Sequence, residues 1–260
     1  MRLENKKAIV TGGACGIGKA TAKRFAKEGA EVCIFDINDE AAAQVVSDIE
    51  KEGGKALAIH CDVGDSKQVN KAFDTAMKFM GGLNILVNNT GVIRQASVLD
   101  TTEEDWDFII RTNLKSVFLC TQRALKEMVP AGNGGRIIGI SSIHSTLSEP
   151  NCGPYTAAKG GMDSFLRTVA TEMAPHKITA NFIRPGATYT ELTIPMYTPS
   201  VKESLNKRIP MKEIAEADWI ANAALFLASD ESRYMTGQNM TIDGGFTMDG
   251  SLPDAVYWEE

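Results

Sequence analysis

Short apolar runs rich in β-branched residues alternate along the chain with longer segments whose apolar residues recur at helical spacing. We expect strands at 7–11, 31–36, 56–61, 85–88, 136–141, 178–183 and 239–242. Between them we expect helices over 16–29, 38–52, 65–80, 102–128, 154–174 and about 217–228. Nearly continuous apolar strands that alternate with helices predict a doubly wound parallel sheet of about seven strands, covered by helices on both faces.

One segment interrupts this alternation. No proline- or serine-rich linker divides the chain, so we expect a single domain over residues 1–260. Residues 187–211 follow the sixth strand and contain Pro195, Pro199 and Pro210. Loops at strand ends often carry function, and we expect 187–211 to form a lid over the substrate. A surface helix packed permanently on the core is the alternative, and the tail 247–260 has no role that the sequence reveals.

Composition narrows the possible partners. The net charge is −6 and no basic cluster is present, which argues against nucleic acid and anionic membranes. The start of the chain has no signal-peptide core and no stretch is apolar enough to span a membrane, so we expect a cytoplasmic protein. The five cysteines form no CxxC pair, which favours buried thiols over a disulfide framework or a metal site.

The glycine-rich stretch TGGACGIG, residues 11–18, lies between the first strand and the first helix. In this context Gly12 permits a tight turn, Gly16 permits close approach to a phosphate, and Gly18 permits close packing of helix on strand. The helix N-terminus would then face the pyrophosphate of a dinucleotide, as in a Rossmann-like fold. An ordinary tight turn is the alternative interpretation.

Asp36 supports the dinucleotide interpretation. It ends the second strand, where a carboxylate can accept hydrogen bonds from the adenosine ribose. A carboxylate there also repels a 2′-phosphate. Because Ile37 follows it, and no basic residue lies within 11–18, we expect NAD rather than NADP.

A second constellation suggests proton transfer. In the stretch YTAAK, Tyr155 and Lys159 are four residues apart and share one helix face. An ammonium near a phenol lowers the pKa of the phenol, which makes it a usable acid and base near neutral pH. Ser142 closes the stretch GISS at the end of the fifth strand, where such sheets bind ligands, with Ser141 as its rival.

The spacing G-x3-G-x-G, with the later YTAAK, resembles the TGxxxGIG and YxxxK motifs of the short-chain dehydrogenase/reductase family. The resemblance covers nearly the whole chain. It implies that Tyr155 is the general acid/base, that Lys159 lowers the pKa of Tyr155 and holds the nicotinamide ribose, and that Ser142 polarises the substrate oxygen. Asn113, in RTNLKSVF, would support a proton relay behind Lys159.

Further motifs extend the resemblance: CDV at 61–63, NNTG at 88–91 and RPGATYT at 184–190. Thr90 stands where relatives have alanine, and 211–219 lacks the glycine and proline common in relatives. The resemblance assigns these residues to the cofactor: Gly12, Gly16, Ile17, Gly18, Asp36, Asp62, Val63, Asn89, Gly91, Tyr155, Lys159, Pro185, Gly186, Thr188 and Thr190.

The implied reaction is reversible hydride transfer between a secondary alcohol or ketone and NAD. Hydroxysteroids, polyols or sugars, cyclic alcohols and 3-oxoacyl thioesters all remain possible substrates. The alternatives are a non-catalytic NAD-sensing protein and an isomerase or dehydratase that holds NAD tightly. Candidate substrate contacts are Ser142, His144, Asn151 and Tyr155, with Arg94, Gln95 and Glu149 as further polar candidates and Leu192, Ile194, Met196 and Tyr197 as apolar ones.

The resemblance also implies a homotetramer that associates through the helices at 102–128 and 154–174. Phe165, Leu166 and Val169 give the second of these helices apolar side chains beyond those needed to face a sheet.

Overall fold

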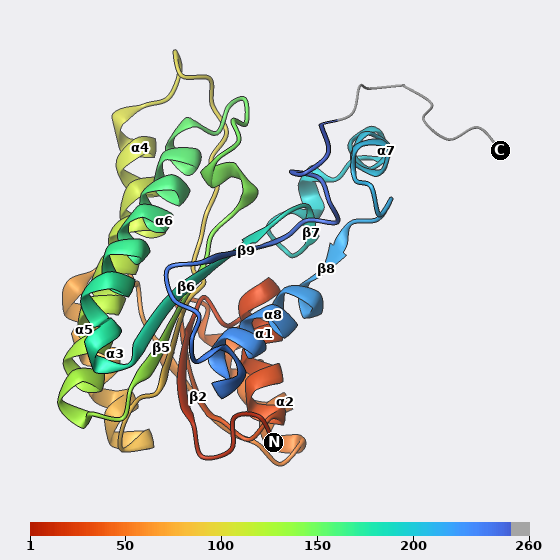
Figure 1. Ribbon diagram of the computed structural model, residues 1–260. Coiled ribbons are helices and arrows are strands. Elements are labelled where there is room, and N and C mark those ends of the chain that lie inside the picture. The colour runs from red at the N-terminus through yellow and green to blue at the C-terminus, as the bar shows by residue number, and fades with distance from the viewer. Residues whose placement is uncertain (251–260) are drawn as a thin grey trace.

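The computed structural model describes residues 1–250 and is built on a parallel sheet of seven strands (Figure 1). Across the sheet the strands are β3 (Lys55–His60), β2 (Glu31–Asp36), β1 (Lys7–Thr11), β4 (Ile85–Asn88), β5 (Gly135–Ile140), β6 (Ile178–Pro185) and β9 (Asn239–Ile242). This is the strand order of a doubly wound dinucleotide-binding sheet with one strand added at the β6 edge. The predicted fold class is confirmed.

Helices cover both faces of the sheet (Figure 1). One face carries α1 (Gly16–Lys27), α2 (Asp39–Lys51) and α8 (Ala217–Ala228). The other face carries α3 (Ser66–Met80), α5 (Ser116–Ala131) and α6 (Gly153–Met173), with α4 (Glu103–Ile110) packed beside α6. Successive strand residues point to opposite faces, so Val10 joins one buried apolar core and Ile9 the other. Burial on both faces explains why the strands read as continuous apolar runs.

The structure agrees with most element bounds expected from the sequence. The strands β1, β2, β4 and β9 have the expected bounds, β3 and β5 each begin and end one residue earlier, and β6 extends to Pro185. The expected helix over 102–128 is instead divided into α4 and α5 by a π-helical turn at Arg111–Lys115. Such turns are frequent at functional sites, and this one contains Asn113.

The segment 187–211 forms a small substructure at one end of the molecule (Figure 1). It contains β7 (Thr188–Tyr189), a 3₁₀ turn at Ile194–Met196 and α7 (Pro199–Arg208). The strand β7 pairs with β8 (Ala215–Glu216), outside the main sheet. The helix α7 contributes no buried residue, so this segment is held by few core contacts.

Strand order locates the ligand-binding edge. The central strand β1 pairs with β2 on one side and with β4 on the other, and the connections that leave β1 and β4 cross to opposite faces. The carboxyl ends of these two strands therefore mark the place where doubly wound sheets bind ligands. The glycine-rich loop begins at this point, directly after Thr11.

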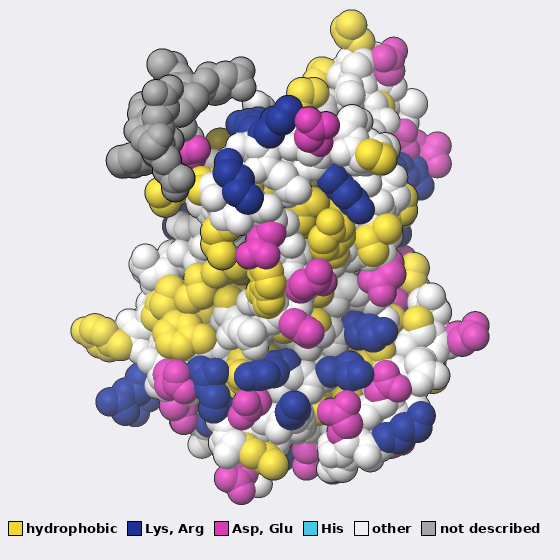
Figure 2. Space-filling view, turned by 90° about the vertical axis from the view of Figure 1, so that its right-hand side faces the viewer, with side chains coloured by type: hydrophobic (Ala, Val, Ile, Leu, Met, Phe, Trp, Pro, Cys, Tyr) yellow, Lys and Arg dark blue, Asp and Glu magenta, His cyan; other side chains and the backbone are white. Residues whose placement is uncertain are grey.

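On the face drawn in Figure 2, Lys and Arg side chains are interspersed with Asp and Glu, and neither sign forms a broad area. No helix within residues 1–250 is long and apolar enough to cross a membrane. All five cysteines are free thiols; four are buried and Cys15 is exposed.

Candidate active site

The glycine-rich loop forms a tight turn that only glycine permits. Gly12 and Gly16 have left-handed backbones, with φ of 62° and 50°. A Cβ atom on Gly18 would lie 2.1 Å from the carbonyl oxygen of Gly12, so any larger residue would separate α1 from β1. The Asn89 side chain donates to the carbonyls of Thr11 and Gly12 at 3.0 and 2.9 Å. Asn89 thus braces the loop, and Ile17 lies in the first turn of α1.

Asp36 is fixed beside this loop. Its Oδ2 accepts a hydrogen bond from the backbone N–H of Ala14 at 3.0 Å, and its Oδ1 accepts one from Asn38 at 3.0 Å. Asn38, in turn, caps α2 by accepting from the N–H of Ala41. The carboxylate therefore faces the loop, and Ile37 beside it is exposed. Spare lone pairs on a positioned carboxylate suit the hydroxyl groups of a ribose.

The N-terminus of α1 makes a contact that the sequence did not reveal. The N–H of Gly16 donates to Oε2 of Glu191 at 2.7 Å. A Cβ on Gly16 would lie only 3.1 Å from Cβ of Thr190, so residues 190–191 pack directly against the glycine loop. A carboxylate thus occupies a position where the helix dipole and a free N–H favour an anion.

Asp62 and Val63 lie at the end of β3, close to the same edge. Oδ2 of Asp62 pairs with Nη1 of Arg111 at 2.8 Å, and Oδ1 accepts from the N–H of Gly64 at 2.9 Å. Val63 is buried. Both Asp62 oxygens thus have protein partners, and Arg111, from the π-helical turn, is a partner that sequence reasoning missed.

Asn113 and Lys159 meet below the end of β4. Oδ1 of Asn113 accepts from the N–H of Val92 at 2.8 Å, and its Nδ2 donates to the carbonyl of Val92 at 2.8 Å. Nζ of Lys159 donates to the carbonyl of Ile140 at 2.7 Å. A Cβ on Gly91 would lie 3.5 Å from Nζ of Lys159 and 3.8 Å from Oδ1 of Asn113. The structure therefore brings Gly91, Asn113 and Lys159 together.

Ser142 and Tyr155 form the end of this cluster that faces a pocket. Their hydroxyl groups are hydrogen-bonded, and both residues line one pocket. Ser142 Oγ also accepts from the N–H of His144 at 3.1 Å, which orients the serine. The rival, Ser141, has a buried hydroxyl with no partner within residues 1–250 and does not line this pocket. The geometry favours Ser142.

Burial dominates the protonation of this cluster. It raises the pKa of Tyr155 to about 12, against the lowering effect of the Ser142 hydrogen bond. It also lowers the pKa of Lys159 to about 8. Nζ of Lys159 lies 5.6 Å from the centre of the Tyr155 ring. The pKa of Tyr155 is therefore raised, where the sequence led us to expect that Lys159 lowers it, because desolvation of the phenolate outweighs the Ser142 hydrogen bond.

The pocket beyond Tyr155 has a volume of about 740 Å³, which suits a small organic ligand. Of the expected substrate contacts, it includes Gln95, His144, Glu149, Met196 and Tyr197. It also includes residues that the sequence did not single out, among them Ile93, Cys152, Val201, Leu205, Arg208 and Phe246. The segment 187–211 thus supplies one wall.

Four other candidates lie outside this pocket. Asn151 is exposed, with a left-handed φ of 64°, and its carbonyl accepts from the N–H of Ala96. Arg94 pairs with Asp105 at 2.5 Å. Leu192 and Ile194 are exposed. The structure uses Asn151 in the turn before α6, which accounts for its position better than substrate contact.

His144 is a neutral candidate for substrate contact. Its Nε2 lies 3.7 Å from a carboxylate oxygen of Glu149, and burial lowers its pKa below the ordinary value despite that carboxylate. Its buried Nδ1 has no partner within the described chain. An imidazole that is neutral near pH 7 can both donate and accept a hydrogen bond.

Pro185 is the last residue of β6, and Gly186 follows it at the same edge. The N–H of Gly186 donates to the carbonyl of Ile242 at 2.9 Å. Thr188 is buried, and its N–H donates to the hydroxyl of Tyr197 at 3.1 Å. The hydroxyls of Thr190 and Thr193 lie 3.0 Å apart. These threonines hold the segment 187–211 in its present form.

Through residue 250, no group of three or more His, Cys, Asp or Glu side chains is placed to hold a metal ion. The loop, Asp36 and the Ser142–Tyr155–Lys159 cluster share the carboxyl edge of the sheet. Together they can position a dinucleotide beside a proton-transferring phenol.

Comparison with known proteins identifies the class. The family model described as Enoyl-(Acyl carrier protein) reductase matches residues 12–247. The chain is 39% identical over 247 residues to the 2,5-dichloro-2,5-cyclohexadiene-1,4-diol dehydrogenase LinX of Sphingobium indicum, covering 95% of this chain and 98% of the relative. It is 38% identical over 248 residues to the 3-oxoacyl-[acyl-carrier-protein] reductase FabG of Thermotoga maritima, covering 95% and 100%.

A solved structure agrees with these relatives. A 7α-hydroxysteroid dehydrogenase complexed with NADH and 7-oxo glycochenodeoxycholic acid superposes with a TM-score of 0.91 at 34% identity, covering 94% of this chain and 95% of that one. The chain belongs to the short-chain dehydrogenase/reductase family and is an oxidoreductase that acts on CH–OH groups.

Proposed function

We propose that this protein is an NAD(H)-dependent dehydrogenase of a cyclic secondary alcohol, with Tyr155 as its general acid/base. The observation that carries the proposal is the hydrogen-bonded Ser142–Tyr155 pair, which lines a pocket at the same sheet edge as the glycine loop and Asp36. Neither a non-catalytic sensor nor a structural protein needs this pair in a pocket.

Each polar residue of the cluster has its own role in the proposed reaction. Ser142 donates a hydrogen bond to the substrate oxygen and orients it toward Tyr155. When the ketone is reduced, the neutral phenol of Tyr155 gives its proton to the substrate oxygen and becomes a phenolate. When the alcohol is oxidised, that phenolate takes the hydroxyl proton and becomes the neutral phenol again. Nicotinamide, when bound, supplies the centre that accepts or gives the hydride. Lys159 is held by the Ile140 carbonyl, where it can reach the nicotinamide ribose, and Asn113 fixes the chain at Val92 beside it.

The glycine loop fits a dinucleotide, since its left-handed glycines leave room for phosphate approach at the N-terminus of α1. Contacts from Ile17, Asp62, Val63, Pro185, Gly186, Thr188 and Thr190 complete the proposed cofactor site. Asp36 selects NAD because its carboxylate would repel the 2′-phosphate of NADP. We expect Asp36→Ala to narrow the preference in kcat/KM for NAD over NADP; a wild-type preference for NADP would contradict the assignment.

A ring-shaped substrate is favoured by the names of two similar proteins, a cyclohexadienediol dehydrogenase and a hydroxysteroid dehydrogenase. The pocket walls agree, since Ile93, Leu205 and Phe246 offer apolar surface to a ring. The second candidate is a 3-oxoacyl thioester, which the Thermotoga maritima relative suggests. Polyols and sugars remain the third class.

The remaining expectations stand as part of the proposal. We propose that residues 1–260 act as one catalytic domain with 187–211 as its lid, that the protein is cytoplasmic, and that it works as a homotetramer. The tail 247–260 lies largely outside the described residues.

The deciding experiment compares wild type with Tyr155→Phe on cyclic secondary alcohols, acyclic secondary alcohols and 3-oxoacyl thioesters, by NADH absorbance. We expect net NAD reduction with a cyclic alcohol, and a loss of about 10²-fold or more in kcat for the variant, because only the acid/base group is removed. NADH binding by the variant should stay within a few-fold. A variant that keeps more than about a tenth of kcat would overturn the role of Tyr155. Absence of net turnover would favour a sensor or an isomerase.

A further inference from the structure

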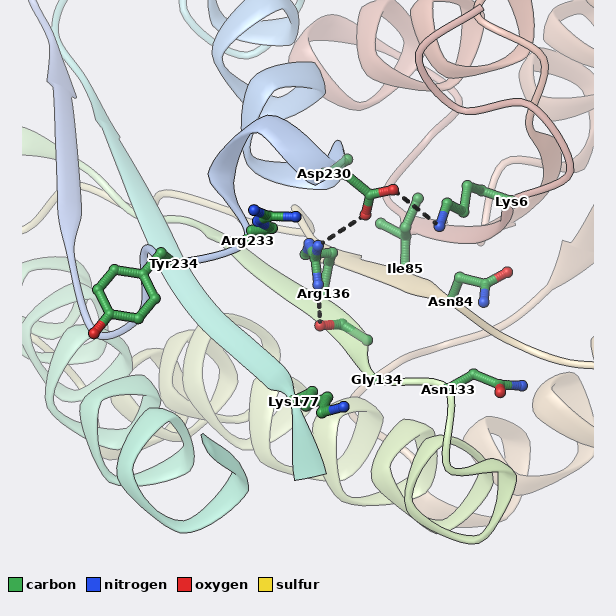
Figure 3. Close-up of a pocket in the computed structure, with 12 residues that line it drawn as sticks. Lys6, Asn84, Ile85, Asn133, Gly134, Arg136, Lys177, Asp230, Arg233 and Tyr234 are labelled. Carbon is green, nitrogen blue, oxygen red and sulfur yellow. Dashed lines mark hydrogen bonds and ion pairs between the residues drawn. The ribbon is translucent and has the colours of Figure 1, made fainter. Parts of the chain in front are cut away.

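A second pocket, of about 350 Å³, lies at the opposite edge of the sheet (Figure 3). Several of its lining residues precede or begin strands: Lys6 precedes β1, Asn84 precedes β4, Arg136 is the second residue of β5, and Lys177 precedes β6. Because the strands are parallel, this is their amino edge, whereas the glycine loop and Ser142 follow carboxyl ends. The pocket is therefore separate from the active site.

Positive charge predominates in this pocket. Four basic side chains line it, from Lys6, Arg136, Lys177 and Arg233, against the single carboxylate of Asp230. That carboxylate is shared, since it lies 3.1 Å from Nη2 of Arg136 and 3.7 Å from Nζ of Lys6. Figure 3 shows Asp230 between these two partners. A chain with a net charge of −6 thus gathers an excess of cations in one concavity.

Arg136 is the buried part of this cluster. Its side chain is 12% exposed, and burial lowers its pKa although Asp230 opposes the change. Its Nε donates to the carbonyl of Ser229 at 3.4 Å and its Nη1 to that of Gly135 at 3.2 Å. The Ser229 carbonyl follows the C-terminus of α8, whose dipole favours a cation. These contacts with the protein itself therefore explain why Arg136 is buried at this position.

The side chains of Lys177 and Arg233, in contrast, do not stabilise the fold in this way. Both are exposed, and the side chain of neither makes a hydrogen bond or ion pair within residues 1–250. The backbone of Lys177 is nevertheless fixed: its φ is 57°, its N–H donates to Ala174, and a Cβ on Gly134 would lie 2.7 Å from its carbonyl oxygen. A firmly held turn thus presents an unpaired ammonium to the pocket.

We propose that this pocket binds a compact anion with two or more negative charges, the class to which pyrophosphate and phosphate monoesters belong. Arg136 leaves N–H donors beyond those given to Ser229, Gly135 and Asp230, and a largely buried guanidinium forms strong bonds to such oxygens. Oδ1 of Asn84 accepts from Lys7, which leaves its NH₂ group as a neutral donor. Lys177 and Arg233 supply the charge that no carboxylate of the pocket balances.

Calorimetric titration of pyrophosphate into the NADH-saturated protein tests the proposal. We expect one site per chain, with the same affinity whether or not NADH is present. The variant Lys177→Asn/Arg233→Gln should bind at least tenfold more weakly. It should fold normally, because neither side chain has a structural bond and asparagine tolerates the left-handed backbone of position 177. The matched control is Lys67→Gln/Lys71→Gln, which removes two exposed charges from α3.

Three results would overturn the proposal. Pyrophosphate that binds the double variant as tightly as wild type would not bind at this pocket. Equal weakening in the α3 control would show a general charge effect. Pyrophosphate displaced by NADH would occupy the glycine loop instead. Failure of the proposed dehydrogenase activity would leave all three comparisons intact, since none of them measures turnover.

Discussion

Burial of the Lys159 ammonium destabilises its charged form. Its side chain is 3% exposed, and its nearest fixed partner is the neutral carbonyl of Ile140. Burial therefore lowers its pKa from 10.5 to about 8. The same burial raises the pKa of Tyr155 from 10.0 to about 12. At pH 7 the free enzyme thus holds a neutral phenol beside a charged ammonium, the state suited to protonating a ketone.

The lowered pKa of Lys159 predicts a pH-dependent stability. The unfolded chain holds the Lys159 proton up to pH 10.5 and the folded chain only to about 8, so the unfolded state binds more protons in this window. The contribution of Lys159 to stability should therefore rise with pH between about 8 and 10, by an amount on the order of 1–3 kcal/mol. Urea unfolding of wild type and Lys159→Met across this window measures it.

Only the difference between the two proteins is informative. Burial raises the pKa values of Cys33 and Cys61 to about 12, so these thiols destabilise both folded proteins as pH rises above 9. As pH increases, the free energy of unfolding of wild type should rise relative to that of Lys159→Met. Parallel stability curves would show that Lys159 titrates in the folded protein as it does in the unfolded chain.

Glu191 offers a second prediction at this scale. Its carboxylate accepts from the N–H of Gly16, at the helix end proposed for the pyrophosphate. We expect Glu191→Gln to lower the Kd of NADH about two- to fivefold, because an anion at a helix N-terminus is worth about 0.3–1 kcal/mol. Fluorescence titration measures the change, with Glu213→Gln as the control because its side chain is exposed and lies outside the glycine loop. Weaker binding by Glu191→Gln would mean that Glu191 instead holds the lid closed over NADH.

Residues close in sequence were easier to predict than distant partners. The Tyr155–Lys159 spacing and the position of Ser142 at a strand end could both be read from the chain. Glu191 and Gly16 are 175 positions apart, and Arg111 and Asp62 are 49 positions apart. No local pattern in the sequence predicts contacts between residues so far apart. The pKa of Tyr155 was also beyond the sequence, since it depends on how completely the folded chain excludes water.

Among the elements, the strands were predicted well and the long helix was not. Continuous apolar runs mark strands buried on both faces, so their bounds follow from composition. The apolar spacing over 102–128 is helical throughout, which gave no sign of the π-helical turn at Arg111–Lys115. That turn places Asn113 against Val92, and only tertiary packing favours it.

The segment 187–211 should respond to ligands more than the core does. Its helix α7 buries no residue, and Thr193 and Tyr197 hold it mainly to Thr188 within the segment itself. We expect hydrogen exchange of 187–211 to slow when NADH and a ketone analogue bind, because closure excludes water from the hydride path. The strands β1 and β4 are the internal control.

A second readout separates a lid from a static helix. Met196 and Tyr197 line the substrate pocket, so alanine at either position should change substrate preference more than NADH affinity. Equal exchange with and without ligands would favour a permanently packed segment.

At the scale of the whole molecule, exposed apolar side chains indicate where further copies could bind. Leu166 and Val169, which the sequence offered as interface residues, are buried in the protein's own core, so that expectation is wrong. Large apolar side chains that are exposed on that side include Trp106 on α4 and Phe118 on α5, and the Phe118 ring meets that of Phe165 edge-on at 6.1 Å.

A second apolar area lies on another side of the molecule. Figure 2 shows hydrophobic side chains gathered between charged ones, on the face toward which α1, α2 and α8 lie in Figure 1. Trp219, on α8, is 42% exposed. Two separate self-complementary surfaces on one chain can build a closed tetramer, since each gives a two-fold interface.

The proposed tetramer can therefore be divided at one interface. We expect Phe118→Glu to convert tetramers into dimers at micromolar concentration, because a carboxylate buried opposite its own copy is neither solvated nor paired. Light scattering after size exclusion measures the mass. Leu99→Glu is the control, since Leu99 is 97% exposed and lies in a loop rather than on α4, α5 or α6. A wild-type monomer would refute the tetramer, whereas an unchanged mass for Phe118→Glu would place the interface elsewhere, with the α8 face and Trp219→Glu as the next variant to test.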